Sequence, residues 1–206
     1  KICSFDCVYC QLGKTKELTQ ERKEYLKVED IISELKSWLT HNPEEAKNLN
    51  YITISGSGEP TLNVKIGEIL AEIKKITAVP VAVITNASLL DKIEVRQALN
   101  MADLIVPSLD AATIETLRKI DRPHGDIKLE EIINGLINLR KECRGKMWLE
   151  VMLVKGVNDS LAHMRKLKEI VDKINPHKIQ LNSPVRTTAE RDVLAVGKNK
   201  LKSMYI

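Results

Sequence analysis

The sequence opens on KICSFDCVYC, residues 1–10, and this stretch decides how the rest of the chain is interpreted. Three of the four cysteines, Cys3, Cys7 and Cys10, lie in it at the spacing C-x3-C-x2-C, while Cys143 is far away in sequence. Three thiolates on one short loop can hold three irons of a [4Fe–4S] cube, whereas full ligation by protein takes four cysteines. One iron would stay open, and an open metal position is typical of a catalytic site.

Two other interpretations of the three cysteines remain open. A structural zinc site uses the same residue type, but it normally has four ligands in paired short spacings, and no second C-x2-C or H-x3-5-H pair follows. A disulfide is the other, and it suits an oxidising compartment that nothing in this sequence indicates. The motif therefore favours an iron–sulfur cluster over zinc.

The chain has 206 residues, 43% hydrophobic and 29% charged, which is ordinary globular composition. That length can bury one sizeable core, so we expect a single domain over residues 1–206, with 183–206 as a C-terminal extension. No apolar run approaches the roughly 20 residues of a membrane-spanning helix, and no signal peptide is visible. We therefore expect a cytoplasmic protein without a membrane partner.

The chain begins at Lys1, directly on the cysteine motif, rather than on a methionine. We interpret it as lacking its natural N-terminus, so that only Lys1 and Ile2 remain of a strand leading into the motif. The net charge is +4, which is mildly basic, and the lysines and arginines are spread along the chain. Such charges usually lie on solvated helix faces, whereas nucleic-acid binding needs a contiguous patch.

Short β-branched apolar runs alternate with stretches of helical periodicity. We expect strands at 51–55, 79–84, 103–109, 147–154 and 178–181, and helices at 28–40, 64–76, 91–99, 112–119, 128–142 and 160–174. Asp91 is a candidate helix cap, and Asn42-Pro43 should end the first helix. The polar residues 11–22 should form a surface excursion, and the tail is weakly helical near 198–204.

Strands that alternate with helices at this spacing form βαβ units and a parallel sheet. With a sixth strand before Cys3, they predict an α/β fold, a partial (βα)6 barrel similar to a TIM barrel but not closed with eight strands. An open Rossmann-type sheet is the competing fold. Its G-x-G-x-x-G fingerprint is missing here, because Gly56-x-Gly58 leads directly into Glu59-Pro60.

Polar residues follow nearly every expected strand. They are the cysteine loop, Ser57-Gly58-Glu59-Pro60, Thr85-Asn86, Ser108 with Asp110, Lys155 with Asn158, and Gln180 with Asn182. The carboxyl ends of parallel strands meet at one edge, where ligands bind in such folds. We therefore expect these residues to form one site.

The cysteine spacing, with Tyr9 just before the last cysteine, resembles the cluster loop of the radical S-adenosylmethionine (radical SAM) enzymes. Gly58-Glu59-Pro60 resembles their GGEP motif, with Ser57 in place of the first glycine of the pair. The resemblance implies that the open iron is chelated by the amino and carboxylate groups of SAM. The cluster then cleaves SAM to methionine and a 5′-deoxyadenosyl radical, which abstracts hydrogen from a substrate.

Further segments extend the resemblance. Thr85-Asn86-Ala87 is similar to the family's TNG segment, although Ala87 replaces the glycine, and Ser108-Leu109-Asp110 is similar to its S-[LIV]-D segment. In the family these line the cofactor pocket and contact the ribose or carboxylate of SAM, the GGEP segment binds the α-amino group, and the backbone at the Tyr9 position meets the adenine. The resemblance thus implies cofactor contacts at Tyr9, Ser57, Gly58, Glu59, Pro60, Thr85, Asn86, Ser108 and Asp110.

The stretches CSFDCVYCQLGKT (3–15) and SLDAAT (108–113), with IDRPH (120–124), resemble bacterial and archaeal Fe–S oxidoreductases similar to the tRNA wyosine-synthesis enzymes. This implies an oxidoreductase- or lyase-type enzyme, a flavodoxin or ferredoxin as electron donor, and a tRNA base as leading substrate. A small molecule or a protein side chain is the alternative substrate, and a zinc-stabilised nucleic-acid-binding module is the non-enzymatic alternative. His124 is a candidate substrate or proton group, although lone loop histidines usually have no such role.

Overall fold

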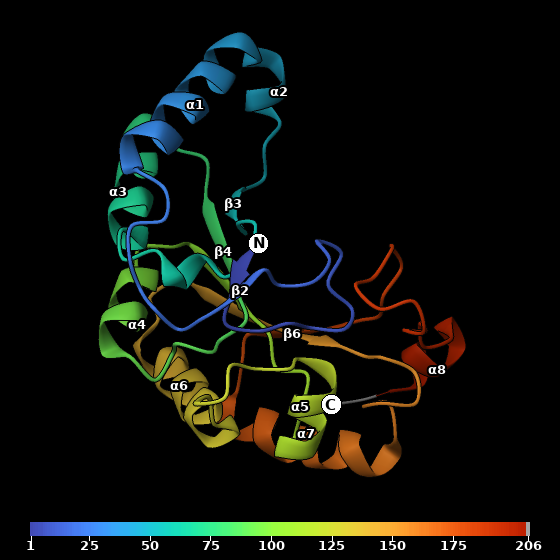
Figure 1. The fold of residues 1–206 in the computed structure, drawn as a ribbon. Helices are drawn as coiled ribbons and strands as arrows, with labels where there is room; N and C mark the ends of the chain where they lie inside the picture. Colours follow the sequence, from blue (N-terminus) through green and yellow to red (C-terminus); the bar gives the residue numbers. More distant parts are fainter. Residues whose placement is uncertain (205–206) are drawn as a thin grey trace.

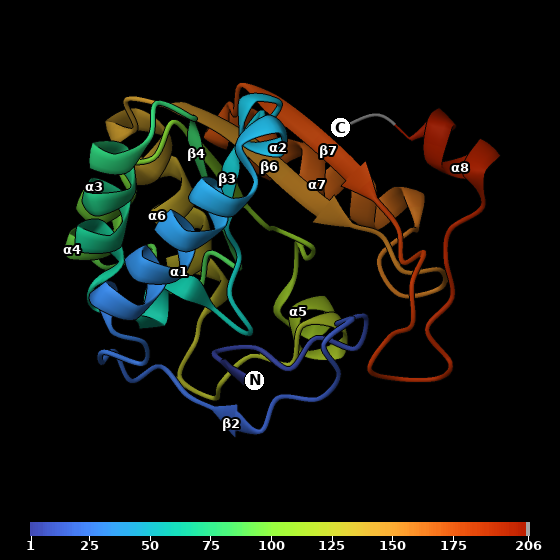
Figure 2. The same cartoon turned by 90° about the horizontal axis from the view of Figure 1, so that it is seen from above.

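The strands form where aliphatic and β-branched residues run together. Within the described residues, 1–204 of the computed structural model, a five-stranded parallel sheet comprises β3 (Ile52–Ile54), β4 (Val81–Thr85), β5 (Leu104–Pro107), β6 (Lys146–Met152) and β7 (Lys178–Asn182). Their order in space follows their order in the chain. The predicted α/β partial barrel is confirmed (Figures 1 and 2). Residues 205 and 206, the end of the expected extension, lie outside the described residues.

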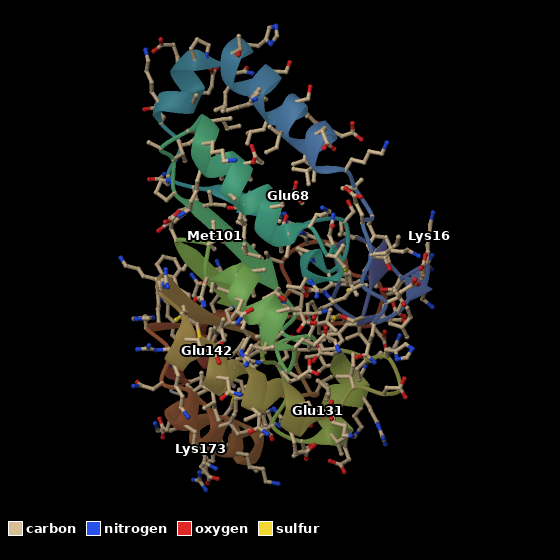
Figure 3. All side chains as sticks on the ribbon, turned by 90° about the vertical axis from the view of Figure 1, so that its left-hand side faces the viewer. Lys16, Glu68, Met101, Glu131, Glu142 and Lys173 are labelled. Carbon is tan, nitrogen blue, oxygen red and sulfur yellow. The ribbon has the colours of Figure 1, made fainter. Side chains whose placement is uncertain are left out.

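Amphipathic helices connect these strands and cover the outer face of the curled sheet (Figures 1 and 2). They are α3 (Ile66–Ile76), α4 (Ile93–Leu99), α5 (Ile114–Ile120), α6 (Leu129–Glu142) and α7 (Leu161–Ile174), preceded by α1 (Val28–His41) and followed by α8 (Lys198–Ser203). Figure 3 shows charged side chains on the outer surface, among them Glu68 on α3 and Lys173 on α7. None of the helices in residues 1–204 has the length and apolar character needed to span a bilayer.

The two faces of the sheet have different surroundings. Val83, Ile105 and Leu149 are fully buried in the main core together with helix residues. The neighbouring strand residues on the other face form a second cluster: Ala82, Leu104 and Val106, with Tyr51 and Trp148 packed against them. Because the helices lie outside the curl, this second face is the inner one, and we call it the concave face.

The N-terminus forms a separate two-stranded sheet, which an isolated bridge links to the loop after β3. β1 (Ile2–Cys3) pairs in parallel with β2 (Glu17–Leu18), and Ile2 also bridges Gly58 in parallel fashion. The strand expected before Cys3 is thus represented by β1, which delivers the cysteine loop to the carboxyl end of β3.

Two short elements, β2 and α2, were not expected, and one expected helix cap was wrong. The polar stretch 11–22 contains β2, whose two exposed residues pair through backbone and so carry no hydrophobic period. Asn42-Pro43 ends α1 but also starts α2 (Pro43–Lys47), since proline suits the first position of a helix, where no N–H is needed. Asp91 does not cap α4: the residue before the helix is Lys92, without a side-chain cap hydrogen bond.

Candidate functional site

The cysteine loop is held by an antiparallel backbone partner, residues 120–124. Val8 N–H donates to the Ile120 carbonyl at 2.9 Å, and His124 N–H donates to the Ser4 carbonyl at 2.8 Å. Phe5 and Pro123 form the bridge between these two hydrogen bonds. The Asp-Arg-Pro-His segment singled out in the sequence therefore acts first through its backbone, as the edge against which the loop is fixed.

Cys3 is buried, Cys7 and Cys10 are half-buried, and all three thiols are free. Within residues 1–204, no three His, Cys, Asp or Glu side chains converge closely enough to hold a single metal ion. The donor set of three free thiols fits an iron–sulfur cluster, because thiolate is the donor that such clusters use.

The thiols lie in surroundings that disfavour negative charge. Burial, followed by the charge of Glu59, raises the pKa of Cys3 from 9.0 to about 11. Burial, followed by the charge of Asp121, raises the pKa of Cys7 well above its ordinary value. A thiol in such a place ionises when a positive metal centre binds it, because the metal charge outweighs the local field.

Gly58 is required by the close approach of β1. Its φ is +150°, and a Cβ at this position would lie 1.7 Å from the carbonyl oxygen of Ile2. The next residue, Glu59, donates its N–H to that same oxygen at 3.2 Å. Of the neighbouring predicted residues, Ser57 is exposed and Pro60 begins a short 3-10 helix, Pro60–Leu62.

Glu59 connects the ends of β3 and β4. Its Oε1 accepts hydrogen bonds from Thr61 N at 3.0 Å, Thr61 Oγ1 at 2.6 Å and Thr85 Oγ1 at 2.6 Å, and its Oε2 accepts one from Asn86 N at 2.7 Å. Burial raises the pKa of this carboxyl, and the hydrogen bonds from Asn86, Thr61 and Thr85 oppose the shift. Glu59 thus holds the loops in place, and Oε2 keeps more acceptor capacity than Oε1.

Asn86 joins β4 to the cysteine loop. Its Nδ2 donates to Ser4 Oγ at 2.9 Å and lies 3.6 Å from Cys3 Sγ, while Ser88 N donates to its Oδ1 at 3.0 Å. The following residue, Ala87, has φ +64°, the left-handed conformation in which glycine costs least. This explains why the related TNG segment has glycine there.

Tyr9, Asp110 and Asp121 form a buried polar cluster behind the loop. The Tyr9 hydroxyl donates to Asp110 Oδ2 at 2.5 Å and lies 3.4 Å from Asp121 Oδ1. Burial raises the pKa of Asp110 to about 7, and burial with the Asp110 charge raises that of Asp121 well above its usual range. Both shifts favour a proton on this carboxyl pair.

Eight of the nine predicted cofactor residues line two separate cavities. Tyr9, Asn86, Ser108 and Asp110 line a cavity of about 10 Å³, which is the space of a single water molecule. Gly58, Glu59, Pro60 and Ser57 line a different, mostly apolar cavity of about 300 Å³ between β3, α1 and α3. A ligand as large as SAM therefore does not fit inside the small cavity.

The sequence placed Asn158 at a strand end of the site but did not reveal its supporting role. Asn158 is fully buried: its Nδ2 donates to the carbonyls of Asp110 and Met152 at 2.8 Å, and its Oδ1 accepts from Val154 N at 2.7 Å. Ser4 and Ser88, 2.6 Å apart, are also buried. No local pattern marks these residues, because their partners are far away in sequence.

The family model of the radical SAM superfamily matches residues 1–167. The chain belongs to the radical SAM superfamily. Its members use a [4Fe–4S] cluster and SAM, so the predicted fold and cofactors agree with the family, and this protein is an enzyme. The zinc-stabilised, non-enzymatic alternative is correspondingly disfavoured.

Relatives differ in name and in length. A GTPase Obg of Brachyspira hyodysenteriae is 42% identical over 202 residues, and a UPF0026 protein of Methanocaldococcus jannaschii is 32% identical over 218 residues; both matches cover 98% of this chain. The chain spans 29% and 67% of their lengths. A probable dual-specificity RNA methyltransferase RlmN of Thermotoga is 26% identical over 195 residues, covering 91% of this chain and 53% of that protein.

Solved structures share the fold. TYW1 with a lysine-pyruvate adduct bound matches with a TM-score of 0.65 and 22% identity, over 94% of this chain and 65% of that one. Streptococcus suis SuiB bound to S-adenosylmethionine matches with a TM-score of 0.70 and 14% identity, over 98% of this chain and 44% of that one. At these identities the likeness concerns the radical SAM fold alone.

Proposed function

We propose that Cys3, Cys7 and Cys10 each bind one iron of a [4Fe–4S] cluster and that SAM occupies the fourth. The observation that carries this proposal is the fixed loop: three free thiols in ten residues, bonded by backbone to β1 and residues 120–124 at the carboxyl end of the sheet. When bound, the cluster supplies the electron that cleaves SAM to methionine and a 5′-deoxyadenosyl radical, which takes a hydrogen atom from the substrate.

The protein's own contribution is to bind SAM in one orientation and keep water away from it. We assign the contacts to the edge formed by Tyr9, Ser57, Gly58, Glu59, Pro60, Thr85, Asn86, Ser108 and Asp110. Backbone carbonyls near Gly58, with the remaining acceptor capacity of Glu59 Oε2, suit an ammonium group. Asp110 and Thr85 contribute mainly by holding the strand ends.

The concave face suits the substrate. Trp148 is half-buried there, with Lys178 Nζ 4.3 Å from its ring centroid, and Val106 packs in the same cluster. Closer to the strand ends, Ser108 bridges Glu150, whose Oε1 accepts from Asn182 Nδ2 at 2.6 Å. An aromatic surface beside carboxylate and amide groups fits a planar base that donates hydrogen bonds.

We therefore propose an RNA base, with a tRNA base first, as the substrate. The similarity to an RNA methyltransferase and the net charge of +4 support this choice. We further propose an oxidoreductase- or lyase-type reaction, a flavodoxin or ferredoxin as electron donor, and a cytoplasmic location, where reduced thiols persist. Residues 1–206 would act as one domain.

The decisive experiment is anaerobic reconstitution with iron and sulfide, followed by electron paramagnetic resonance of the reduced protein with and without SAM. A reduced-cluster signal that changes on adding SAM supports an iron that SAM occupies. A signal indifferent to SAM, or no cluster in a chain extended at its N-terminus, would overturn the proposal.

The substrate class is tested by RNA binding at several salt concentrations. Binding of mixed tRNA that weakens steeply with salt indicates phosphate contacts by lysine and arginine. Absent or salt-insensitive binding would favour the alternative, a small molecule or a protein side chain.

A further inference from the structure

One side of the cysteine loop is covered by the 120–124 backbone, and its other side faces the end of the chain. On the first side, Val8 donates its N–H to Ile120. On the other, the Val8 carbonyl, between Cys7 and Tyr9, accepts the N–H of Glu190 at 3.1 Å. Residues that are 182 positions apart in sequence (190 minus 8) thus meet at the centre of the motif.

Glu190 belongs to an irregular segment that is fastened at both ends. This segment, residues 183–196, leaves β7 and returns to the end of β6, and we call it the strap (Figures 1 and 2). At its start, Ser183 Oγ donates to the Leu153 carbonyl at 2.8 Å and accepts the N–H of Val196, from its other end, at 2.8 Å. Lys155 N–H donates to the Leu194 carbonyl at 3.0 Å. Both ends of the strap are therefore fixed, and this holds its middle part, which contains Glu190, in place.

The Glu190 side chain joins two segments that flank the cysteines. Arg122 Nη1 donates to its Oε1 at 2.6 Å, and Lys14 Nζ lies 3.7 Å from the same oxygen. Arg122 lies within the loop's backbone partner, residues 120–124, and has φ +46°, an unusual value for a residue with a side chain. Nearby, Arg186 Nη1 donates to Gln11 Oε1 at 3.0 Å. One carboxylate thus links Arg122, in the loop's backbone partner, to Lys14, which follows the last cysteine of the motif.

We propose that the strap is a clamp on the cysteine loop and that Glu190 is its positioning residue, which keeps the loop in the conformation that holds the cluster. This inference rests on the proposed function for its consequence, cluster retention, but the clamp itself is a property of the cofactor-free chain. Glu190 acts through the loop backbone and through Arg122 and Lys14, and it touches no reacting atom. Weakening the contacts of Glu190 frees the loop segment that carries Cys7 and Cys10 without disturbing the sheet.

Glu190→Gln tests the ion pairs, because it removes the charge and keeps the backbone N–H that bonds Val8. The matched control is Glu169→Gln, on the exposed face of α7. Hydrogen exchange of the cofactor-free chain should become about two- to five-fold faster in the peptide covering residues 4–13, as loss of a partly exposed ion pair predicts. The exchange of the β4 and β5 peptides should not change.

The reconstituted proteins give a second readout. Glu190→Gln should lose iron to a chelator several-fold faster than wild type and broaden the reduced-cluster resonance, with Glu169→Gln unchanged in both. Wild-type exchange in 4–13 together with wild-type iron loss would overturn the clamp. If the wild-type chain takes up no cluster at all, the proposed function fails. The hydrogen exchange of residues 4–13 in the cofactor-free variant and wild type then still shows whether Glu190 holds the cysteine loop.

Discussion

Cys7 and Cys143 are the same residue type in two different settings. Cys7 lies on the loop fixed by residues 120–124, whereas Cys143 follows α6 and its thiol faces the Arg140 carbonyl at 3.5 Å. Only the first setting is a short segment that carries two further cysteines, Cys3 and Cys10, which is why we assign the cluster to it.

Cys7→Ser should therefore abolish the reconstituted cluster, because a serine hydroxyl does not replace a thiolate ligand. Iron and sulfide analysis with the visible absorption of the cluster measures this, and far-ultraviolet circular dichroism should show the fold intact. Cys143→Ser is the matched control and should retain full iron content. A Cys7→Ser protein that still holds wild-type iron would contradict the assignment.

The buried carboxyl pair gives a pH dependence. Burial raises the pKa of Asp110 from 3.8 to about 7, so the folded chain keeps a proton that the unfolded chain releases. Stability from this group is complete below the unfolded pKa and is lost as the pH rises through the folded one. The free energy of unfolding should therefore decrease between about pH 4 and pH 7.

Asp110→Asn should make the decrease in the free energy of unfolding between about pH 4 and pH 7 smaller by about 2 kcal/mol. This figure allows for the coupling of Asp110 to Asp121. Urea unfolding of the cofactor-free chain near pH 5 and pH 7 measures it. Asp126→Asn, whose side chain is 85% exposed, is the control and should keep the wild-type pH dependence. If Asp110→Asn keeps it too, the pair does not hold a buried proton.

At the scale of secondary-structure elements, the close packing of α6 against the turn before α4 depends on a glycine at the contact. Gly135 lies within α6, and a Cβ there would come 2.6 Å from the backbone carbonyl carbon of Leu90. Leu90 is fully buried in the turn before α4, so it has little room to move. Glycine is a poor helix former, so helix propensity does not account for its place in α6. The contact with Leu90 that requires it is not indicated by the local sequence.

Gly135→Ala should destabilise the fold by about 1–3 kcal/mol, because the overlap outweighs the roughly 1 kcal/mol gained in helix propensity. Gly67→Ala in α3 is the matched control: its Cβ would lie 3.2 Å from the Ala98 Cβ, a contact that small shifts relieve. Denaturant unfolding compares the two. A Gly135→Ala variant as stable as Gly67→Ala would show that α6 can move away.

At the scale of the whole molecule, the cofactor edge and the concave face are separate parts of one sheet. The cysteine loop and Asn86 lie at the strand ends, whereas Trp148 lies within β6 on the concave face. Binding of SAM and binding of substrate should therefore respond to different substitutions.

Trp148→Ala should weaken tRNA binding roughly ten-fold, since base–aromatic stacking contributes about 1–3 kcal/mol. The SAM-induced change of the resonance signal should persist. Trp38→Ala on α1, whose tryptophan is 39% exposed, is the control and should bind tRNA like wild type. Equal weakening by both variants would place the RNA elsewhere.

The order of elements was predictable because it depends on local patterns. Each expected strand is found within a few residues, and the helix boundaries follow the apolar period of residues such as Ile66, Ile69 and Ile73. Short polar elements were not predictable. β2 and α2 bury no apolar residue, so nothing in their composition separates them from loops.

By itself, the sequence determined the family, the three thiols and the alternation of strands and helices, because these depend on residue type, spacing and period. The tertiary structure alone decided what Glu59, Asn158 and Glu190 do, since each bonds a residue distant in sequence. It also decided that Asp110 and Asp121 are both buried beside the Tyr9 hydroxyl. Burial and long-range hydrogen bonding arise only when the chain folds, and no local period records them.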